Sequence, residues 1–306
     1  MNYVFDIKGG IGKHIAFTSF IRWLNEKFPK SQITIVSAYP EIFEHNPRVY
    51  RNLPMMQAYL FEDYIKGRDF RSGEVYQQYE FYREENKKHI CEMWPKAYGF
   101  NEYDKTFHNE IFLTEGENMD GMVYCEQNKP IITFQPLGGL PPGAQPNRMK
   151  IDSTGRDIPY PMAMKIVQIL NSKGFKVLQL RGPTERPLPG TLQLQMPFRN
   201  MLPVIKNAVA HIGIDSSFMH AAAAWEKPQL IFWGQTHKDN FGYPYKKFMS
   251  VWREKGMHCR PHVGMPDNKG LYQYESKNRG FEMDYTDKEI ENHIDKFLEM
   301  LNGQKT

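Results

Sequence analysis

The sequence predicts an α/β protein made of two Rossmann-like domains whose parallel sheets face one another across a cleft. Short apolar runs alternate with segments of helical periodicity in two cycles, one starting near residue 3 and the other near residue 130. The chain of 306 residues is long enough for two domains. A glycine-rich turn joins the first apolar run to the first helical segment, as in sheets that bind ligands at their carboxyl edge.

The first cycle opens with the apolar run 3–5 and the turn "DIKGGIGKH". Apolar residues at helical spacing then continue until Pro29 stops the helix. The β-branched run 31–40 predicts the next strand, and 39–53 predicts a short helix, a turn and an extended piece. Residues 60–110 are rich in Tyr, Glu and Lys, and we expect them to be helical and to face solvent.

The second cycle repeats this alternation. It predicts strands at 129–139, 175–183, 209–214 and 228–235, and helices at 160–174, 196–208 and 215–227. Residues 287–301 form an amphipathic pattern, which predicts a last helix that packs back on the fold. The expected domains are therefore 1–125 and 126–285, followed by a C-terminal helix and tail at 286–306.

Composition argues against a membrane-spanning, secreted or disulfide-rich protein, and the distribution of charge indicates possible ligands. No apolar run approaches the ~20 residues that cross a bilayer, the N-terminus lacks a signal-like layout, and three distant cysteines imply no disulfide framework, so we expect a cytoplasmic protein. Residues 62–117 hold thirteen acidic and eight basic side chains, whereas 237–279 hold nine basic and four acidic ones among many aromatics. Such a basic, aromatic stretch suits phosphates, sugars or nucleic acid, or it is a solvated loop with its aromatics packed inward.

The glycine-rich turn contains Gly9, Gly10 and Gly12. Glycines at the start of a helix let backbone N–H groups approach an anion or a sugar. The spacing matches neither the dinucleotide fingerprint nor the phosphate loop, in which His14 would have to be Ser or Thr. A tight turn with no ligand explains the pattern equally simply.

A second group of polar residues stands at a predicted strand-to-helix junction. Asp215, Ser216 and Ser217 open the helix, and His220 lies one turn further on. Hydroxyls and free N–H groups at such a helix start can hold a diphosphate. Alternatively, Asp215 or Ser216 only caps the helix and His220 packs in the core.

These motifs together resemble the bacterial heptosyltransferase family, which uses nucleotide sugars and has the two-Rossmann-domain GT-B-type fold. The segment "GGIGKHIAFTSFIRWLNEKFPKSQITIV" is similar to the family's first strand-turn-helix-strand, and "NPRV" to its N-P-x-V turn. The segment "IGIDSSFMHAAAAWEKPQLIFWGQT" resembles its long D-[TS]-[GS]-x-x-H signature. The likeness covers most of 3–45 and 130–240.

The resemblance implies a donor site on the second domain and an acceptor site on the first. Ser216 and Ser217 would hold the diphosphate of a nucleotide sugar, with Asp215 and His220 lining the same pocket. Arg156 would supply the charge of the family's phosphate-binding lysine, unless it is a plain surface charge. Arg181 and Gly182 would border the base. The fold typically needs no cofactor and no divalent ion, and the Cys259–His262 region lacks the ligand pairs of a zinc site.

One departure from the family concerns the catalytic base. The family carries an acidic residue directly after the last glycine of the turn, where this sequence has Lys13. An ammonium is a poor base but can neutralise a leaving diphosphate. The base would then be His14 or, less favoured, Asp6 at the end of the first strand. In the alternative, Lys13 is solvated, His14 packs and Asp6 pairs with a lysine.

The first hypothesis is thus a glycosyltransferase that moves a sugar from a nucleotide-diphosphate sugar to an acceptor hydroxyl, by resemblance on a lipopolysaccharide core or another surface glycan. Contact with a membrane surface is compatible with it, and the sequence indicates no oligomeric state. A modified, hydroxymethylated DNA base is the alternative acceptor, suggested by the basic stretch 237–279. The rival from another class is a non-catalytic module that binds nucleotide sugars, suggested by Lys13.

Overall fold

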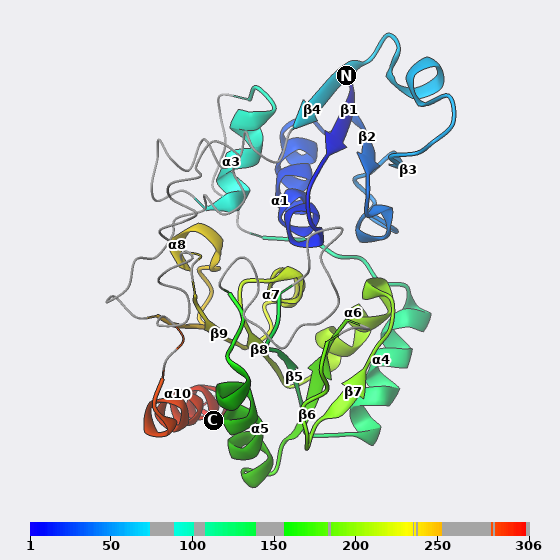
Figure 1. Cartoon of the computed structure of the whole chain (residues 1–306). Coiled ribbons are helices and arrows are strands. Elements are labelled where there is room, and N and C mark those ends of the chain that lie inside the picture. Colours follow the sequence, from blue (N-terminus) through cyan, green and yellow to red (C-terminus); the bar gives the residue numbers. More distant parts are fainter. Residues whose placement is uncertain are drawn as a thin grey trace.

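Two parallel sheets, stacked one above the other in Figure 1, organise the chain. This computed structural model describes residues 1–73, 89–100, 108–138, 156–182, 185–234, 236, 238–252, 283 and 285–303. The two sheets confirm the predicted α/β fold class. None of the helices within these ranges is both long and apolar enough to cross a membrane.

The first lobe contains a four-stranded sheet in the order β3-β2-β1-β4. Its strands are β1 (Asn2–Ile7), β2 (Gln32–Ser37), β3 (Arg51–Pro54) and β4 (Asp69–Gly73). Its helices are α1 (Ile11–Lys27), the 3₁₀ turn η1 (Pro40–Ile42), the π-helical turn η2 (Leu60–Ile65) and α3 (Ile90–Ala97).

The second lobe contains a six-stranded sheet in the order β10-β9-β8-β5-β6-β7. Its strands are β5 (Ile131–Gln135), β6 (Lys176–Leu180), β7 (Leu192–Leu194), β8 (Ala210–Gly213), β9 (Gln229–Phe232) and β10 (Phe248–Val251). Its helices are α4 (Glu115–Gln127), α5 (Tyr160–Ser172), α6 (Phe198–Asn207), α7 (Ser217–Ala223), α8 (Lys238–Phe241) and α10 (Asp287–Asn302).

Four elements differ from the sequence prediction. Residues 69–73, expected to be helical, form β4, which pairs with β1. The expected domain boundary at 125/126 falls within α4, a helix that was not predicted and that begins at a Thr114 capping box. Strands β7 and β10 were not predicted, because their sequences show neither a clear apolar run nor an alternating pattern.

The position of α4 also bears on the domain boundary. A division at residue 125 cuts through α4, which lies against α6 of the second lobe in Figure 1. A Cβ on Gly121 would stand 2.4 Å from the Pro203 carbonyl group, so the two helices touch backbone to backbone. The segment 108–114, which precedes α4, is therefore the better boundary.

The helix α10 belongs to the core of the second lobe. Ile290, Ile294 and Phe297 are buried in one cluster with Ile166 and Leu170 of α5. Thr286 and Glu289 form a capping box that fixes where α10 begins. The predicted C-terminal helix therefore packs back onto α5 rather than forming a separate unit (Figure 1).

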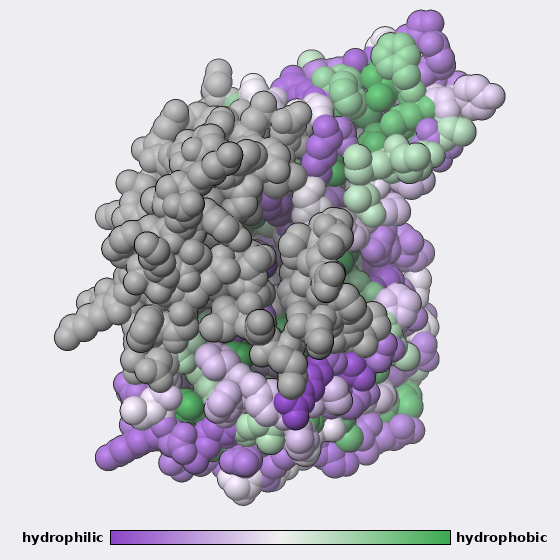
Figure 2. Space-filling model, in the orientation of Figure 1, coloured by the Kyte–Doolittle hydropathy of each residue, from purple (hydrophilic) through white to green (hydrophobic). Residues whose placement is uncertain are grey.

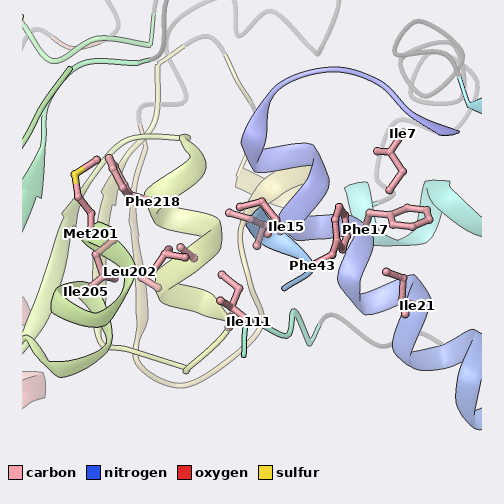
Figure 3. Close-up of a cluster of buried hydrophobic side chains, with 14 of the residues drawn as sticks. Ile7, Ile15, Phe17, Ile21, Phe43, Ile111, Met201, Leu202, Ile205 and Phe218 are labelled. Atoms are coloured by element: carbon pink, nitrogen blue, oxygen red, sulfur yellow. The ribbon is translucent and has the colours of Figure 1, made fainter. Parts of the chain in front are cut away.

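The helix α1 is buried on almost every side, since residues 14–21 are all buried. Sheet residues such as Phe5 cover one side of it, and residues of α6 and α7 close the other in the same hydrophobic cluster. Figure 3 shows Ile15 on the side of α1 that faces α7. Its two buried hydroxyls, on Thr18 and Ser19, donate to the carbonyl oxygens of Ile15 and Ala16. One apolar core thus joins the two lobes.

An apolar patch lies on the surface of the first lobe, beyond β3. Met56 and Tyr59 are 94% and 78% exposed, and Met55 and Phe61 are exposed beside them in the sequence. Figure 2 shows apolar residues gathered at this place, at the upper right. Gathered apolar side chains often mark a contact surface.

Candidate functional site

Both sheets reverse their strand order at a point that faces the same junction. In the first sheet the reversal lies between β1 and β4, and in the second between β5 and β8. In parallel α/β sheets, ligands bind outside the carboxyl ends of the strands at such a switch point. The residues that follow these four strands therefore form the candidate site.

A side-chain hydrogen bond spans each switch point. The Ser72 hydroxyl at the end of β4 donates to Oδ2 of Asp6 on β1, at 2.9 Å. The Ser216 hydroxyl after β8 donates to Oε1 of Gln135 at the end of β5. These bonds hold the carboxyl ends of neighbouring strands at a fixed spacing.

The glycine-rich turn brings the start of α1 against α7. Gly9 has a φ of 107°, a backbone angle that residues other than glycine rarely adopt. A Cβ on Gly12 would lie 2.8 Å from Cδ2 of His220 and 3.6 Å from the Ser217 Cα. A Cβ on Gly10, the N-cap residue, would meet nothing within 4 Å. The glycine at position 12 thus makes room for the other lobe.

The predicted donor residues of α7 gather on the other side of this contact. Ser216 is the N-cap, and its hydroxyl accepts from the Met219 N–H at 3.5 Å. Asp215 is buried, with Oδ1 3.6 Å from Nε2 of His220. The Arg156 guanidinium donates to the Asp215 carbonyl at 3.2 Å and lies 3.7 Å from its Oδ2.

Arg156 is therefore no plain surface charge, because its side chain is only 23% exposed and is directed at the end of β8. Burial lowers the pKa of His220 to about 3, and the nearby Arg156 charge acts in the same direction. The imidazole is consequently neutral at physiological pH. Ser217, the first residue of α7, is partly exposed next to them.

Arg181 and Gly182 follow β6, on the other side of β5 from Asp215. The Arg181 guanidinium donates to Oε1 of Gln193 at 2.7 Å and to the Glu185 carbonyl at 2.8 Å. These bonds hold the loop between β6 and β7. The geometry does not join this pair to the Asp215 group.

The two candidates for a base differ in access. His14 is fully buried beside Tyr39 and Phe43, and its Nδ1 lies 3.0 Å from the Gly10 carbonyl. Burial lowers the pKa of His14 to about 4, although the Gly10 and Ile7 carbonyls oppose this effect. His14 thus packs, as one of the sequence alternatives had it.

Asp6 lies at the end of β1, and 14% of its side chain is exposed. Its Oδ2 accepts from the Ser72 hydroxyl and lies 3.6 Å from the Lys8 ammonium, the lysine pairing that the sequence alternative expected. Its Oδ1 is buried and has no hydrogen-bond partner among the described residues. Lys13 follows in the first turn of α1 and is partly exposed. The geometry favours Asp6 over His14, the reverse of the order expected from the sequence.

Sequence reasoning missed four polar residues of this junction: Gln135, Ser72, Asn109 and Tyr243. Gln135 and Ser72 end strands, which is a signal that could have found them. Tyr243 belongs to the basic, aromatic stretch, but Asn109 lies in a region without a recognisable motif. Both contact His220: Asn109 bonds to its carbonyl oxygen, and the Tyr243 hydroxyl bonds to Nδ1 of its ring.

The aromatic side chains of the basic stretch pack inward where the structure describes them. Phe241 and Tyr243 are buried, and Tyr245, Phe248 and Trp252 are partly buried against the same cluster. Residues 253–282, including Cys259 and His262, lie outside the described residues. Elsewhere in the described ranges, no group of three or more His, Cys, Asp or Glu could hold a metal ion.

The sequence model of glycosyltransferase family 9 (heptosyltransferase) matches residues 188–273. This segment includes β8, α7 and the site residues Asp215 to His220. A comparison with curated proteins found no match.

Several solved structures share the fold. A glycosyl transferase of family 9 from Veillonella parvula is 13% identical, with a TM-score of 0.70 and 97% of both chains covered. The ADP-heptose lipopolysaccharide heptosyltransferase II of E. coli is 12% identical, with a TM-score of 0.59 and both chains fully covered. E. coli heptosyltransferase WaaC with ADP is 11% identical, with a TM-score of 0.53, 91% of this chain and 100% of that one covered. These findings confirm the heptosyltransferase-like resemblance and the GT-B-type fold.

The close approach at Gly12 gives a first prediction. Gly12→Ala should lower the free energy of unfolding by about 1–3 kcal/mol, because the new methyl group overlaps the fixed His220 ring. Gly116 also stands second in its helix, but a Cβ there meets nothing within 4 Å. Gly116→Ala should therefore be neutral or stabilise by up to about 1 kcal/mol. Equal effects of the two variants in urea unfolding would contradict the close contact.

The buried histidines give a second prediction. Burial lowers the pKa of His14 to about 4 and those of His89, His211 and His220 to about 3, below the ~6.5 of an unfolded histidine. The folded protein holds these histidines in their neutral form, so their contribution to stability is complete above pH ~6.5. It is lost as the pH falls toward their pKa values in the folded state.

The free energy of unfolding should thus fall between pH 7 and pH 5, by up to about 1.4 kcal/mol per unit for each histidine. His14→Leu should reduce this slope by up to about 1.4 kcal/mol per pH unit, because one titrating group is removed. The matched control is His45→Asn, at an exposed position whose φ of 58° asparagine tolerates, and it should keep the slope. Parallel curves for wild type and His14→Leu would show that His14 does not titrate as described.

Proposed function

We propose that this protein is a cytoplasmic glycosyltransferase that moves a sugar from a nucleotide-diphosphate sugar to an acceptor hydroxyl, without a cofactor or a metal ion. The observation that carries the proposal is the meeting of two sheet switch points at the contact of α1 with α7. A donor on one sheet and an acceptor on the other would then lie within reach of each other. The family match over residues 188–273 supports this reading.

The donor would bind to the second lobe. The Arg156 guanidinium and the hydroxyl of Ser217 lie where β8 leads into α7, and both can bind phosphate oxygens. The neutral imidazole of His220 adds no charge there but can donate a hydrogen bond. Since one structural neighbour was solved with ADP, ADP and ADP-heptose are the first ligands to test.

Chemistry would take place in front of the glycine-rich turn. The acceptor oxygen attacks the anomeric carbon, the bond from that carbon to the diphosphate oxygen breaks, and the hydroxyl proton passes to Asp6. Asp6 is the better candidate than His14 because its side chain is partly exposed, whereas His14 is fully buried. Lys13 and Arg156 would neutralise the charge that develops on the leaving diphosphate.

The acceptor we propose is a lipopolysaccharide core or another surface glycan, in line with the neighbour that acts on lipopolysaccharide. No observation favours a DNA base, because the aromatic residues 241–252 pack inward. A non-catalytic module remains the outcome if donors bind but are never turned over.

Donor binding tests the Arg156 site. ADP at concentrations far above its Kd should raise the Tm of the wild type, since a ligand of the folded state stabilises it by mass action. Arg156→Gln should weaken ADP binding about 10- to 100-fold, as expected for a charge-assisted phosphate contact. Isothermal titration calorimetry measures both affinities.

The matched control is Lys165→Gln, which removes another cation of the second lobe. Lys165 lies on α5 and pairs with Asp287 on α10 at 2.9 Å, and Figure 1 draws both of these helices away from α7. ADP affinity should stay within twofold of the wild type. Equal loss in both variants would point to a general charge effect, and no loss with Arg156→Gln would refute this site.

Catalysis tests Asp6. Asp6→Asn keeps the shape of the side chain and removes its basicity, so kcat should fall about 10²- to 10⁴-fold. ADP affinity should remain unchanged, because Asp6 lies on the other sheet. Transfer from ADP-heptose to a lipopolysaccharide acceptor is the assay, and a kcat within fivefold of the wild type would remove Asp6 from the mechanism.

A further inference from the structure

Beside the candidate site, the buried side chains of Asn109 and Tyr243 form a chain of hydrogen bonds that ends at His220. Nδ2 of Asn109 lies 3.1 Å from the His220 carbonyl oxygen and 2.6 Å from the Tyr243 hydroxyl. The same hydroxyl lies 2.6 Å from Nδ1 of His220. All three residues are at most 4% exposed, so these contacts exclude water.

The direction of each bond follows from which groups can donate. A backbone carbonyl only accepts, so the atom of Asn109 that faces the His220 carbonyl must be its NH₂ group. That NH₂ also faces the Tyr243 hydroxyl, whose oxygen therefore accepts. The Cys91 thiol, 3.7 Å from the amide oxygen, supports the same orientation of the amide.

The hydroxyl proton of Tyr243 is then left for His220. Burial raises the pKa of Tyr243 well above its usual value, so the phenol keeps its proton. With its oxygen accepting from Asn109, the phenol donates to Nδ1 of His220. A neutral imidazole that accepts at Nδ1 carries its single proton on Nε2.

The protonated nitrogen points into the junction between the lobes. Nε2 lies 3.6 Å from Oδ1 of Asp215, and a Cβ on Gly12 would be 3.4 Å from it. Ionisable groups around the ring are Asp215, Arg156 and Tyr243, together with His89, whose ring packs against Tyr243.

We propose that Asn109 and Tyr243 are positioning residues that hold His220 as its Nε2–H tautomer, so that the site offers a neutral hydrogen-bond donor and no base at this point. The tautomer follows from contacts of the free protein. Its use, donation to a phosphate oxygen of the nucleotide diphosphate, rests on the proposed function.

Nitrogen-15 NMR of the free protein, labelled at histidine, tests the tautomer. Long-range ¹H–¹⁵N spectra should show a protonated Nε2 and an unprotonated Nδ1 for His220, unchanged from pH 5 to pH 8. The signals that disappear in His220→Gln identify the ring. A protonated Nδ1 in the wild type would overturn the proposal without the need for any further variant.

Tyr243→Phe removes the hydroxyl and keeps the ring. The two nitrogen shifts of His220 should then move toward one another, as in a mixture of tautomers, and unchanged shifts would refute the role of Tyr243. The matched control is Tyr245→Phe, because that hydroxyl contacts Gln229 at 2.6 Å and the Lys227 carbonyl at 2.9 Å, in the same cluster. This variant should leave the His220 shifts in place.

Calorimetry with ADP tests the use of the tautomer. Tyr243→Phe should weaken ADP binding about 2- to 3-fold, because only the fraction of molecules with the proton on Nε2 can donate to phosphate, and Tyr245→Phe should keep the affinity within about 1.3-fold of the wild type. Equal affinities of wild type and Tyr243→Phe would overturn the donation to phosphate. If the wild type does not bind ADP, the proposed function fails, whereas the NMR result on the tautomer stands by itself.

Discussion

The start of α1 lies directly against the start of α7, and this contact brings the two halves of the site together. Because residue 12 has no side chain, the His220 ring can lie against the backbone of the other lobe. Two helix starts, and the carboxyl ends of the sheets that lead to them, are thereby placed opposite each other. A larger residue at position 12 would separate the two halves of the site.

The junction between the lobes is mostly apolar and contains a few buried hydrogen bonds. A single cluster of buried side chains runs from Phe5 and Ile15 to Met201 and Phe218, so the lobes share a core (Figure 3). The segment 108–114 crosses beside it and is bonded to both lobes, since the Glu110 N–H donates to the Thr18 hydroxyl and Asn109 donates to the His220 carbonyl. Burial of unpaired polar groups is costly, and each of these bonds removes that cost.

Much of the fold could be predicted from local pattern. Elements such as β1, α1, β8 and α10 have clear apolar runs, periodicity or caps, and the order of alternation implied parallel sheets. The strands β4, β7 and β10 could not be predicted, because their sequences lack a clear strand pattern and they owe their conformation to pairing with a neighbour. The helix α4 was missed because it is mostly polar and lies against α6 through Gly121.

The residues at strand ends and helix starts could be told from local pattern alone, since these are local positions: Asp6, the glycine turn and the group from Asp215 to His220. How each residue is buried and bonded there depends on the tertiary contacts. Burial lowers the pKa of His14, the loop after β6 holds Arg181, and a hydrogen bond from the distant Tyr243 sets the proton of His220. Access and protonation depend on neighbours far away in the chain, and a local pattern contains no information on them.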